Sequence, residues 1–182
     1  MMMAMQDRMG DVRGKDFLLT WVPHPKPLNT AAANSAILMA SKMGMNVRML
    51  VPDDAYRLDE RYMGAAERFC SDAGTQFSIT TDIETAYSGA HMVYAKSWGA
   101  LPFFGQWENE APYRAKGANF MIDDAKMAMT DNGLVSHCLP MRRNVKIADS
   151  VVDSDAFLGI EEAENRLHVQ KAIMETLVRG GS

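Results

Sequence analysis

The sequence contains few cysteines, few prolines and no long apolar run, and each shortage excludes a class of protein. Cys70 and Cys138 are its two cysteines and no CxxC pair occurs, so neither a disulfide framework nor a zinc site is indicated. With seven prolines, 47% hydrophobic and 23% charged residues, the chain is not expected to be disordered, collagen-like or a coiled coil. No apolar run approaches the roughly eighteen residues of a membrane span, and we expect a cytoplasmic protein without membrane contact.

The sequence also lacks a net positive charge. Its formal net charge is −4 and its pI is near 5.5, whereas a nucleic-acid or anionic-membrane surface would require a basic face. A small-molecule ligand is therefore expected, with no nucleic-acid partner. The length of 182 residues fits one ordinary domain.

Several catalytic and cofactor motifs are missing. GxGxxG, GxSxG and HExxH do not occur, and the four histidines show no ligand spacing. Residues 10–16 (GDVRGKD) resemble a phosphate-binding loop, but they have three residues between the glycines where four are needed, and they precede a strand. We expect neither a metal nor a cofactor.

Short apolar runs alternate with helical segments along the chain, which predicts an α/β fold. The expected architecture is a Rossmann-like three-layer sandwich with a mostly parallel sheet of about five strands. The predicted strands are Phe17–Val22, Val47–Val51, Gln76–Thr80, His91–Ala95 and Leu134–Cys138, of which Gln76–Thr80 is the weaker, with a sixth β-like run at Ala156–Ile160. The predicted helices are Asn29–Gly44, Asp59–Ala73, Asp82–Ser88, Asp123–Thr130, Val145–Val152 and Glu162–Val178, and residues 96–119 form a long functional loop.

Three predicted strands are followed by polar segments, at residues 24–30, 96–99 and 137–146. Open parallel sheets bind ligands at the carboxyl ends of their strands. The segments supply cations to one edge of an acidic protein, which predicts a pocket for an anionic small molecule; these cations are Lys26, Lys96, Arg142, Arg143 and Lys146. Each segment could alternatively be a plain loop, and His137 and Cys138 could be inert core residues.

The last predicted helix carries a wide apolar arc that includes one cation. Arg166 lies inside that arc, where a charge is costly unless it is paired. Its partner could be an anionic ligand, or alternatively Glu162 or Glu164 in an internal salt bridge.

Two motifs identify a family. His137-Cys138-Leu139-Pro140 resembles the HCLP motif of ornithine-type carbamoyltransferases, and residues 162–166 resemble their EAENR motif. HPKPLNTA, LDERYM, YAKSWGALPFFG and HCLPMRRNVK are similar to the N-acetylornithine branch of that family, from about Asp11 to Leu177.

The resemblance covers only the second half of such an enzyme. Family members have an amino-terminal domain with SxRT and HPxQ motifs, and neither occurs here. The resemblance implies that residues 15–182 are a single ornithine-binding (C-terminal) domain, with residues 1–14 forming the end of an interdomain helix and a turn. Because the partner domain is absent, we expect the last helix either to leave apolar surface uncovered or to bury it against another copy. The resemblance also implies that the intact enzymes are trimers with active sites between subunits.

The reaction that the resemblance implies is carbamoyl transfer from carbamoyl phosphate to the δ-amine of N-acetylornithine in arginine biosynthesis, without a cofactor. Arg166 and the backbone carbonyls of Cys138 and Leu139 would be catalytic, and the Leu139-Pro140 bond would be cis. The expected substrate-binding residues are Lys96, Ser97, Trp98, Asn29, Arg142, Lys146 and His137. The isolated chain is expected to be inactive.

Lys96 determines the substrate prediction. Ornithine carbamoyltransferases carry an aspartate at this place, which pairs with the free α-ammonium of ornithine, so the charge here is inverted. Acylation of the α-nitrogen removes that ammonium and leaves the α-carboxylate, which a lysine can bind. We therefore expect N-acetylornithine, with N-succinylornithine left open. The alternative is a non-catalytic domain that binds a small anion or an amino acid, or that has a regulatory role.

Overall fold

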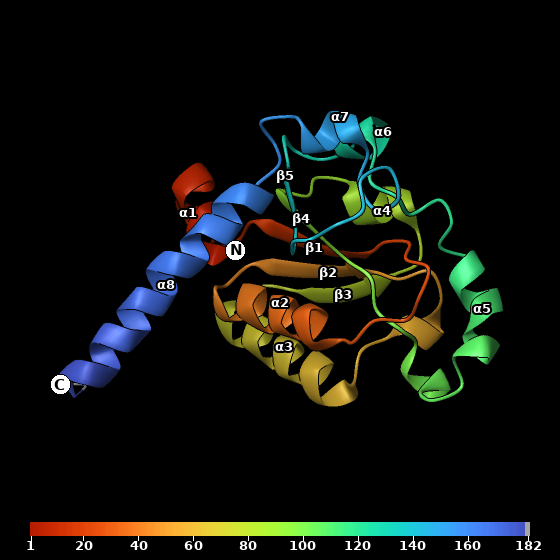
Figure 1. Ribbon diagram of the computed structural model, residues 1–182, viewed down its shortest axis with the longest axis horizontal. Helices are drawn as coiled ribbons and strands as arrows, with labels where there is room; N and C mark the ends of the chain where they lie inside the picture. The colour runs from red at the N-terminus through yellow and green to blue at the C-terminus, as the bar shows by residue number, and fades with distance from the viewer. Residues whose placement is uncertain (181–182) are drawn as a thin grey trace.

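The computed structural model describes residues 1–180 and forms a five-stranded sheet with helices on both faces (Figure 1). The strands are β1 (Asp16–Trp21), β2 (Asn46–Leu50), β3 (Phe77–Thr80), β4 (Met92–Lys96) and β5 (Leu134–His137). Their order is β3-β2-β1-β4-β5 and every pairing is parallel. The predicted fold class is confirmed, because each of the first five predicted strand segments overlaps a strand.

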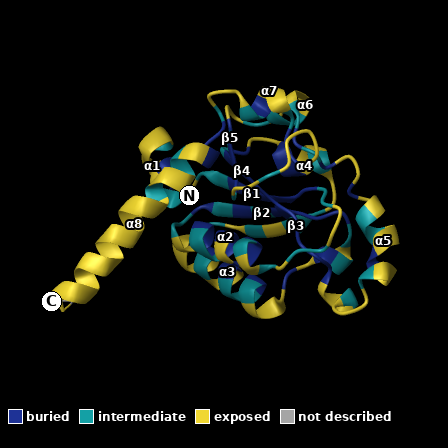
Figure 2. Cartoon of the chain, viewed as in Figure 1, coloured by how far each residue is buried: buried dark blue, intermediate teal, exposed yellow. Residues whose placement is uncertain are grey.

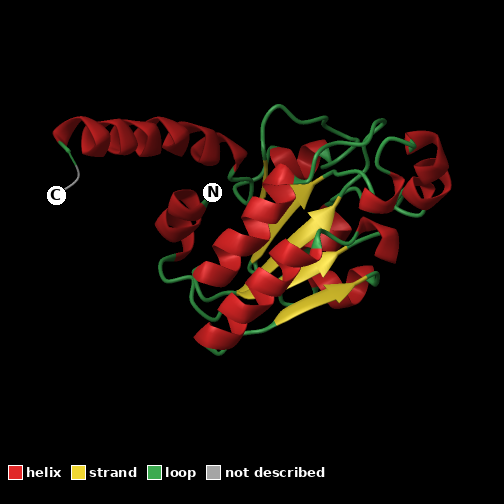
Figure 3. Cartoon of the chain, turned by 90° about the horizontal axis from the view of Figure 1, so that it is seen from below, coloured by secondary structure: helices red, strands yellow, loops and turns green. Residues whose placement is uncertain are grey.

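The helices alternate with these strands. They are α1 (Met2–Met9), α2 (Ala31–Lys42), α3 (Glu60–Ala73), α4 (Ile83–Tyr87), α5 (Trp107–Ala115), α6 (Asp124–Met127), α7 (Asp149–Val152) and α8 (Gly159–Arg179), with short 3-10 turns η1 (Asp54–Tyr56) and η2 (Leu101–Phe103). Helices α2 and α3 cover one face of the sheet, and α4, α6 and α7 cover the other (Figures 1 and 3). The central strand β1 is buried on both sides, as Phe17, Leu18 and Leu19 show no exposure.

Helix ends follow the sequence signals at α3 and α4. Asp59 precedes α3 and its side chain accepts from the Arg61 N–H, while Gly74 ends the helix in the left-handed conformation at φ 72°. Asp82 caps α4 in the same way by accepting from the Thr85 N–H. These caps fix where the polypeptide enters and leaves the sheet.

Three predicted segments differ from the structure. Residues 156–160 are not a strand, because Phe157 forms only an isolated bridge to Val135 and α8 begins at Gly159. Residues 145–148 are not helical, because Ile147 pairs with Ile122 and the helix starts only at Asp149. Residues 96–119 contain η2 and α5, although Pro112 lies inside α5.

The start of α2 also differs by a small shift. Thr30 occupies the N-cap position and the helix begins at Ala31, not at Asn29. The Asn29 side chain still accepts the Ala31 N–H at 3.1 Å, so this asparagine serves the first turn from one residue farther out.

The last helix extends away from the sheet (Figure 1), and most of its length is exposed (Figure 2). Its exposed apolar residues are Ile160, Leu167, Val169, Ile173, Met174, Leu177 and Val178. The prediction of uncovered apolar surface on this helix is confirmed. Residues 181 and 182, the end of the predicted domain, lie outside the described residues. Within residues 1–180, no helix has the length and apolar character needed to cross a membrane.

Candidate functional site

The candidate site lies at the carboxyl ends of the central strands of the sheet. Strands β1 and β4 are neighbours at the point where the strand order β3-β2-β1-β4-β5 changes direction, and open parallel sheets bind ligands at such a point. His24 follows β1, Lys96 ends β4 and His137 ends β5. The fold thus brings the three predicted polar segments to one edge.

Lys96 is a buried cation without a partner. Its relative exposure is 7%, and neither a hydrogen bond nor an ion pair is found for its ammonium in the described chain. The buried side-chain polar atoms without a partner in the described chain are Asn34 Oδ1 and Tyr87 OH, so the Lys96 ammonium itself reaches solvent, and an anion from outside can pair with it. Lys96 is the clearest sign of an anionic ligand.

A second buried lysine lies close to the first. Lys146 Nζ is 2.9 Å from His137 Nε2, and both side chains are buried. Burial, and next the charge of Lys96, lower the pKa of Lys146 to about 8. Burial and Lys146 lower the pKa of His137 to about 3, so the imidazole is neutral and accepts from the Lys146 ammonium. Its other nitrogen, Nδ1, contacts the Cys138 carbonyl oxygen, which places the ring proton there.

The segment after His137 forms one wall of a groove. The Leu139-Pro140 peptide bond is cis, as the motif implied. A groove of about 520 Å³ is bordered by Cys138 and Leu139 from this segment and by Arg166 from α8. The three predicted catalytic residues therefore meet at one groove.

The arginines of the site differ in their partners. Arg166 is exposed and forms no ion pair with Glu162 or Glu164, so the internal salt bridge is absent from the described residues. Arg142 is exposed, and its charge reaches Lys146 and His24. Arg143 instead pairs with two carboxylates on or beside α7, those of Asp149 and Asp153.

Two of the predicted binding residues use their polar atoms inside the fold. The Ser97 hydroxyl donates to the Val22 carbonyl at 2.7 Å. The Trp98 indole N–H donates to the Tyr56 carbonyl at 2.8 Å, and its ring is buried. Ser97 and Trp98 thus hold the end of β4 in place, and Asn29 serves the start of α2.

His24 lies near Lys96, Arg142 and Lys146, which we call the cation cluster. The family motifs did not assign a role to this histidine. Burial lowers the pKa of His24, and Lys146, Arg142 and Lys96 lower it further. It lies in the first polar segment, two residues before Lys26, so its position after β1 was the available signal. Within residues 1–180, no cluster of three or more His, Cys, Asp or Glu side chains could hold a metal.

The comparisons with known proteins agree on one family. The family model for aspartate/ornithine carbamoyltransferase, Asp/Orn binding domain, matches residues 27–177. The N-acetylornithine carbamoyltransferase of Xanthomonas campestris pv. campestris is 56% identical over 178 residues, which cover 97% of this chain and 52% of that protein. The N-succinylornithine carbamoyltransferase of Bacteroides thetaiotaomicron is 30% identical over 163 residues, 90% of this chain and 46% of that protein.

The fold matches solved structures as well. A crystal structure of acetylornithine transcarbamylase complexed with acetylcitrulline superposes with a TM-score of 0.92 and 57% sequence identity. The match covers 94% of this chain and 52% of the solved one. This chain spans about half the length of the curated relatives that it matches.

Proposed function

This chain belongs to the aspartate/ornithine carbamoyltransferase family, and from that membership we propose that it is the amino-acid-binding half of an N-acetylornithine carbamoyltransferase. The complete enzyme would transfer the carbamoyl group of carbamoyl phosphate to the δ-amine of N-acetylornithine, a step of arginine biosynthesis. This half would bind the amino acid and would be inactive alone.

The observation that carries the proposal is the buried, unpaired Lys96 at the end of β4. Its ammonium would bind the α-carboxylate of the substrate, a charge-assisted contact that is stronger than a neutral hydrogen bond. A free α-ammonium at the same place would be repelled by about 1 to 4 kcal/mol, for charges 4 Å apart at effective dielectrics of 80 to 20. The site is thereby suited to an ornithine whose α-nitrogen is acylated.

The remaining cations would act on the reacting groups. Arg166 would stabilise the carbonyl oxygen of the carbamoyl group, which gains negative charge during the reaction. The carbonyls of Cys138 and Leu139 would accept from the carbamoyl NH₂. Lys146 and Arg142 would lower the pKa of the δ-amine, which favours its neutral, nucleophilic form. His137 would keep Lys146 in place, because its Nε2 accepts from that ammonium.

The reaction needs no group beyond the two substrates. The lone pair of the δ-nitrogen forms a bond to the carbamoyl carbon and gives a tetrahedral intermediate. The bond between that carbon and the phosphate oxygen then breaks, and the δ-nitrogen loses one proton, which the departing phosphate takes up. The products would be N-acetylcitrulline and inorganic phosphate.

Identity to relatives favours an acetyl over a succinyl substrate. The N-acetylornithine carbamoyltransferase from Xanthomonas shares 56% of its aligned residues with this chain, against 30% for the N-succinylornithine carbamoyltransferase from Bacteroides.

Ser97, Trp98 and Asn29 would support this site by fixing the loops around it.

The partners follow from the length of the relatives. We propose that an amino-terminal carbamoyl phosphate-binding domain, or another copy within a trimer, covers the apolar face of α8. Both cysteines are free thiols, which agrees with the expected cytoplasmic location.

Calorimetric titration of this chain tests the proposal. N-acetyl-L-ornithine, N-succinyl-L-ornithine, L-ornithine and carbamoyl phosphate are titrated singly, and each amino acid is titrated again with carbamoyl phosphate present. The proposal expects saturable heat with N-acetylornithine and none with L-ornithine. Equal affinity for L-ornithine would contradict it, and binding of carbamoyl phosphate alone would favour a small-anion-binding domain.

A further inference from the structure

The ion pair of Glu110 and Arg114 lies beside the site and is separate from the cation cluster. Glu110, from α5, is completely buried in the long segment between β4 and β5. Its carboxylate oxygen Oε2 accepts from Arg114 Nη2 at 2.8 Å, one helical turn away. This pair is electrically balanced, so it adds no net charge to a site that already holds unpaired cations.

The pair connects three loops that follow three different strands. Glu110 Oε1 accepts from the Tyr56 hydroxyl at 2.7 Å, in η1 after β2, and from the Ala100 N–H at 3.3 Å, after β4. Arg114 Nη1 donates to the Pro25 carbonyl at 3.0 Å, in the turn after β1. Helix α5 itself stands at the end of the molecule away from α8 (Figure 1).

The Tyr56 hydroxyl that donates to Glu110 keeps its proton throughout the ordinary pH range. Burial, and next the hydrogen bond to Glu110, raise the pKa of the Tyr56 phenol far above its usual value. The Tyr56 carbonyl in turn accepts from the Trp98 indole at 2.8 Å. Trp98 lies two residues after Lys96, so the contact chain from Glu110 leads to the end of β4.

Arg114 contacts the turn that follows β1. Pro25 lies between His24 and Lys26, and the Lys26 N–H donates to His24 Nδ1 at 3.1 Å, which fixes the turn internally. The turn also contacts the loop after β4, since the Gly99 N–H donates to the Leu28 carbonyl at 2.8 Å. A side chain at Gly99 would place its Cβ 2.7 Å from Pro27, so the two loops pack too closely for any other residue.

The turn that Arg114 holds faces open space. A groove of about 560 Å³ runs along it and is lined by His24 and Pro25 from the turn and by Trp107 and Arg114 from α5. His24 also feels the charges of Lys146, Arg142 and Lys96. The pair thus touches the loops that border the site without touching the cations in it.

We propose that Glu110 and Arg114 are positioning residues for the site, which hold the His24-Pro25-Lys26 turn at a fixed place relative to Lys96. A buried ion pair gains little net stability, because its desolvation penalty offsets the attraction between the charges. What the pair provides is a defined geometry of three loops, and that geometry sets where the substrate carboxylate and its acyl group can lie. The identity of that ligand rests on the proposed function, whereas the positioning does not.

The experiment compares Arg114→Lys and Glu110→Gln with the control Lys116→Gln. Lysine at 114 can pair with Glu110 but lacks the planar fork that reaches the Pro25 carbonyl at the same time. Lys116 ties the same segment to Asp53 at 2.6 Å, next to η1, but within residues 1–180 it forms no hydrogen bond or ion pair with the turn. If Glu110→Gln fails to fold, Arg114→Lys alone decides the outcome, because Arg114 is partly exposed.

The first readout is the pKa of His24, measured by NMR in this chain without ligand. We expect Arg114→Lys and Glu110→Gln to raise it toward the ordinary histidine value, since the turn moves away from the cations and toward water, while Lys116→Gln leaves it unchanged. An unchanged His24 pKa in both variants, with lowered thermal stability, would overturn the proposal and leave a purely structural pair.

The second readout is the dissociation constant of N-acetyl-L-ornithine. We expect about a tenfold rise in Arg114→Lys and no change in Lys116→Gln, because displacement of a binding loop weakens binding without removing a contact group. If the wild-type chain binds no N-acetylornithine but the His24 pKa still responds to Arg114→Lys, the proposed function fails and the positioning role stands. Unchanged affinity in Arg114→Lys would contradict a role of the pair in substrate recognition.

Discussion

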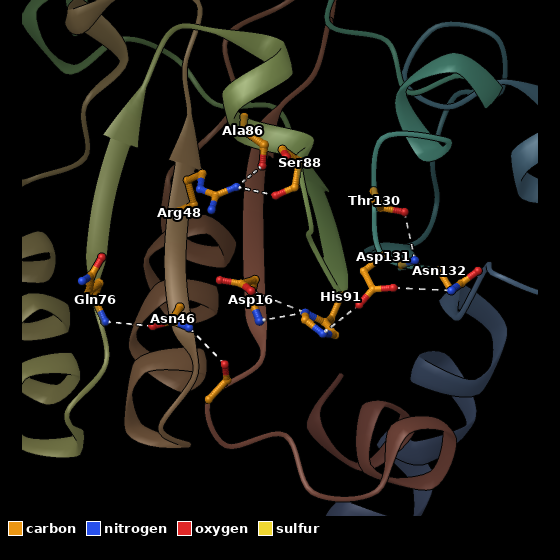
Figure 4. Close-up of polar contacts among 12 residues, drawn as sticks. Asp16, Asn46, Arg48, Gln76, Ala86, Ser88, His91, Thr130, Asp131 and Asn132 are labelled. Carbon is orange, nitrogen blue, oxygen red and sulfur yellow. Dashed lines mark hydrogen bonds and ion pairs between the residues drawn. The ribbon is translucent and has the colours of Figure 1, made fainter.

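The polar residues at the two ends of the parallel strands differ in whether they have partners within the fold. We call the side of the sheet where the strands begin the amino edge and the side where they end the carboxyl edge. At the amino edge, His91 lies between two carboxylates, with Nδ1 3.6 Å from Asp16 and Nε2 3.6 Å from Asp131 (Figure 4). Asn46 links neighbouring loops there, donating to the Gly14 carbonyl and accepting from the Gln76 N–H. On β2, Arg48 donates to three backbone carbonyls in and after α4, those of Thr85, Ala86 and Ser88.

At the carboxyl edge, several cations lack partners, although Arg143 pairs with Asp149 and Asp153. Lys96, Arg142 and Arg166 form no ion pair in the described chain, and Lys146 contacts a neutral imidazole. Polar groups that close a fold find partners within it, whereas groups that serve a ligand are left with an unfilled position. The contrast between the edges therefore separates structural polarity from functional polarity within one sheet.

The strongest test of the comparison is the activity of the chain by itself. We expect no measurable carbamoyl transfer, because both halves of such a site must position the transferring group. A coupled assay for phosphate release with carbamoyl phosphate and N-acetylornithine measures it. Turnover close to that of a complete family member would show that the carboxyl edge alone suffices.

The next effect concerns Lys96, in a protein that joins this chain to an amino-terminal carbamoyltransferase half. Lys96→Asp should lower kcat/KM for N-acetylornithine by about 30-fold to 1000-fold, the usual cost of removing one partner of a buried charge pair. L-ornithine should gain in relative terms, because aspartate attracts its α-ammonium. The argument from charge inversion is wrong if the unmodified enzyme already prefers L-ornithine.

Lys146→Met should stabilise the fold while it weakens ligand binding. Burial lowers the pKa of Lys146 in the folded chain to about 8, below the ordinary lysine value of 10.5, so its buried charge costs free energy at pH 7. We expect the free energy of unfolding to rise by about 1–3 kcal/mol, measured with urea at pH 7. Lys116→Met, at an exposed lysine, serves as the control.

The sign of the pH effect on stability follows from the same pKa. Below pH 8 both the folded and the unfolded chain carry the Lys146 charge, so the cost is fully present. Between about pH 8 and 10.5 the folded chain loses this proton first, and stability rises with pH in the wild type. Lys146→Met should abolish that rise, and a rise that persists in the variant would assign it to another group.

Ligand binding should show a pH dependence of opposite sign. The probe is N-acetyl-L-norvaline, which has the α-carboxylate but no δ-amine to titrate. Its affinity should fall about tenfold as pH rises above 8, because Lys146 loses its charge. With a pKa of about 3, His137 stays neutral from pH 5 to 7 and contributes no step there. A step near pH 6.5 that is lost in His137→Gln would contradict this assignment.

The smallest effect is expected at the amino edge. His91→Gln retains an acceptor for the Asp16 N–H, and the two carboxylates beside it are partly exposed. Stability should change by less than about 1 kcal/mol and ligand affinity should not change at all. Reduced affinity for N-acetylornithine in this variant would erase the distinction between the edges.

Sequence patterns predicted the sheet and the edge that holds the site. Buried parallel strands are continuous apolar runs, and the rule that ligands bind at carboxyl ends then assigned Lys96, His137 and Lys146 to one place. The helix α5 was missed because Pro112 lies inside it, and because the burial of Glu110 depends on Tyr56, far away in sequence.

The hydrogen-bond partners of individual polar side chains could not be predicted from the sequence either. Ser97 and Trp98 follow Lys96 directly, yet their polar atoms donate to the carbonyls of Val22 and Tyr56. Only the three-dimensional neighbours of a side chain decide whether it serves the fold or a ligand. The family motifs identified the candidate residues, and the packing showed which of them form hydrogen bonds within the fold.

Amide chemical shifts of the ¹⁵N-labelled chain test the central claim most directly, because they detect weak binding and compare both edges in one spectrum. Titration with N-acetyl-L-ornithine should shift the amides of Lys96, His137 and Lys146 and leave those of Asp16 and His91 in place, and L-ornithine should shift neither set. Equal shifts with L-ornithine, or shifts confined to the amino edge, would contradict the assignment of the unpaired cations to an acylated amino acid.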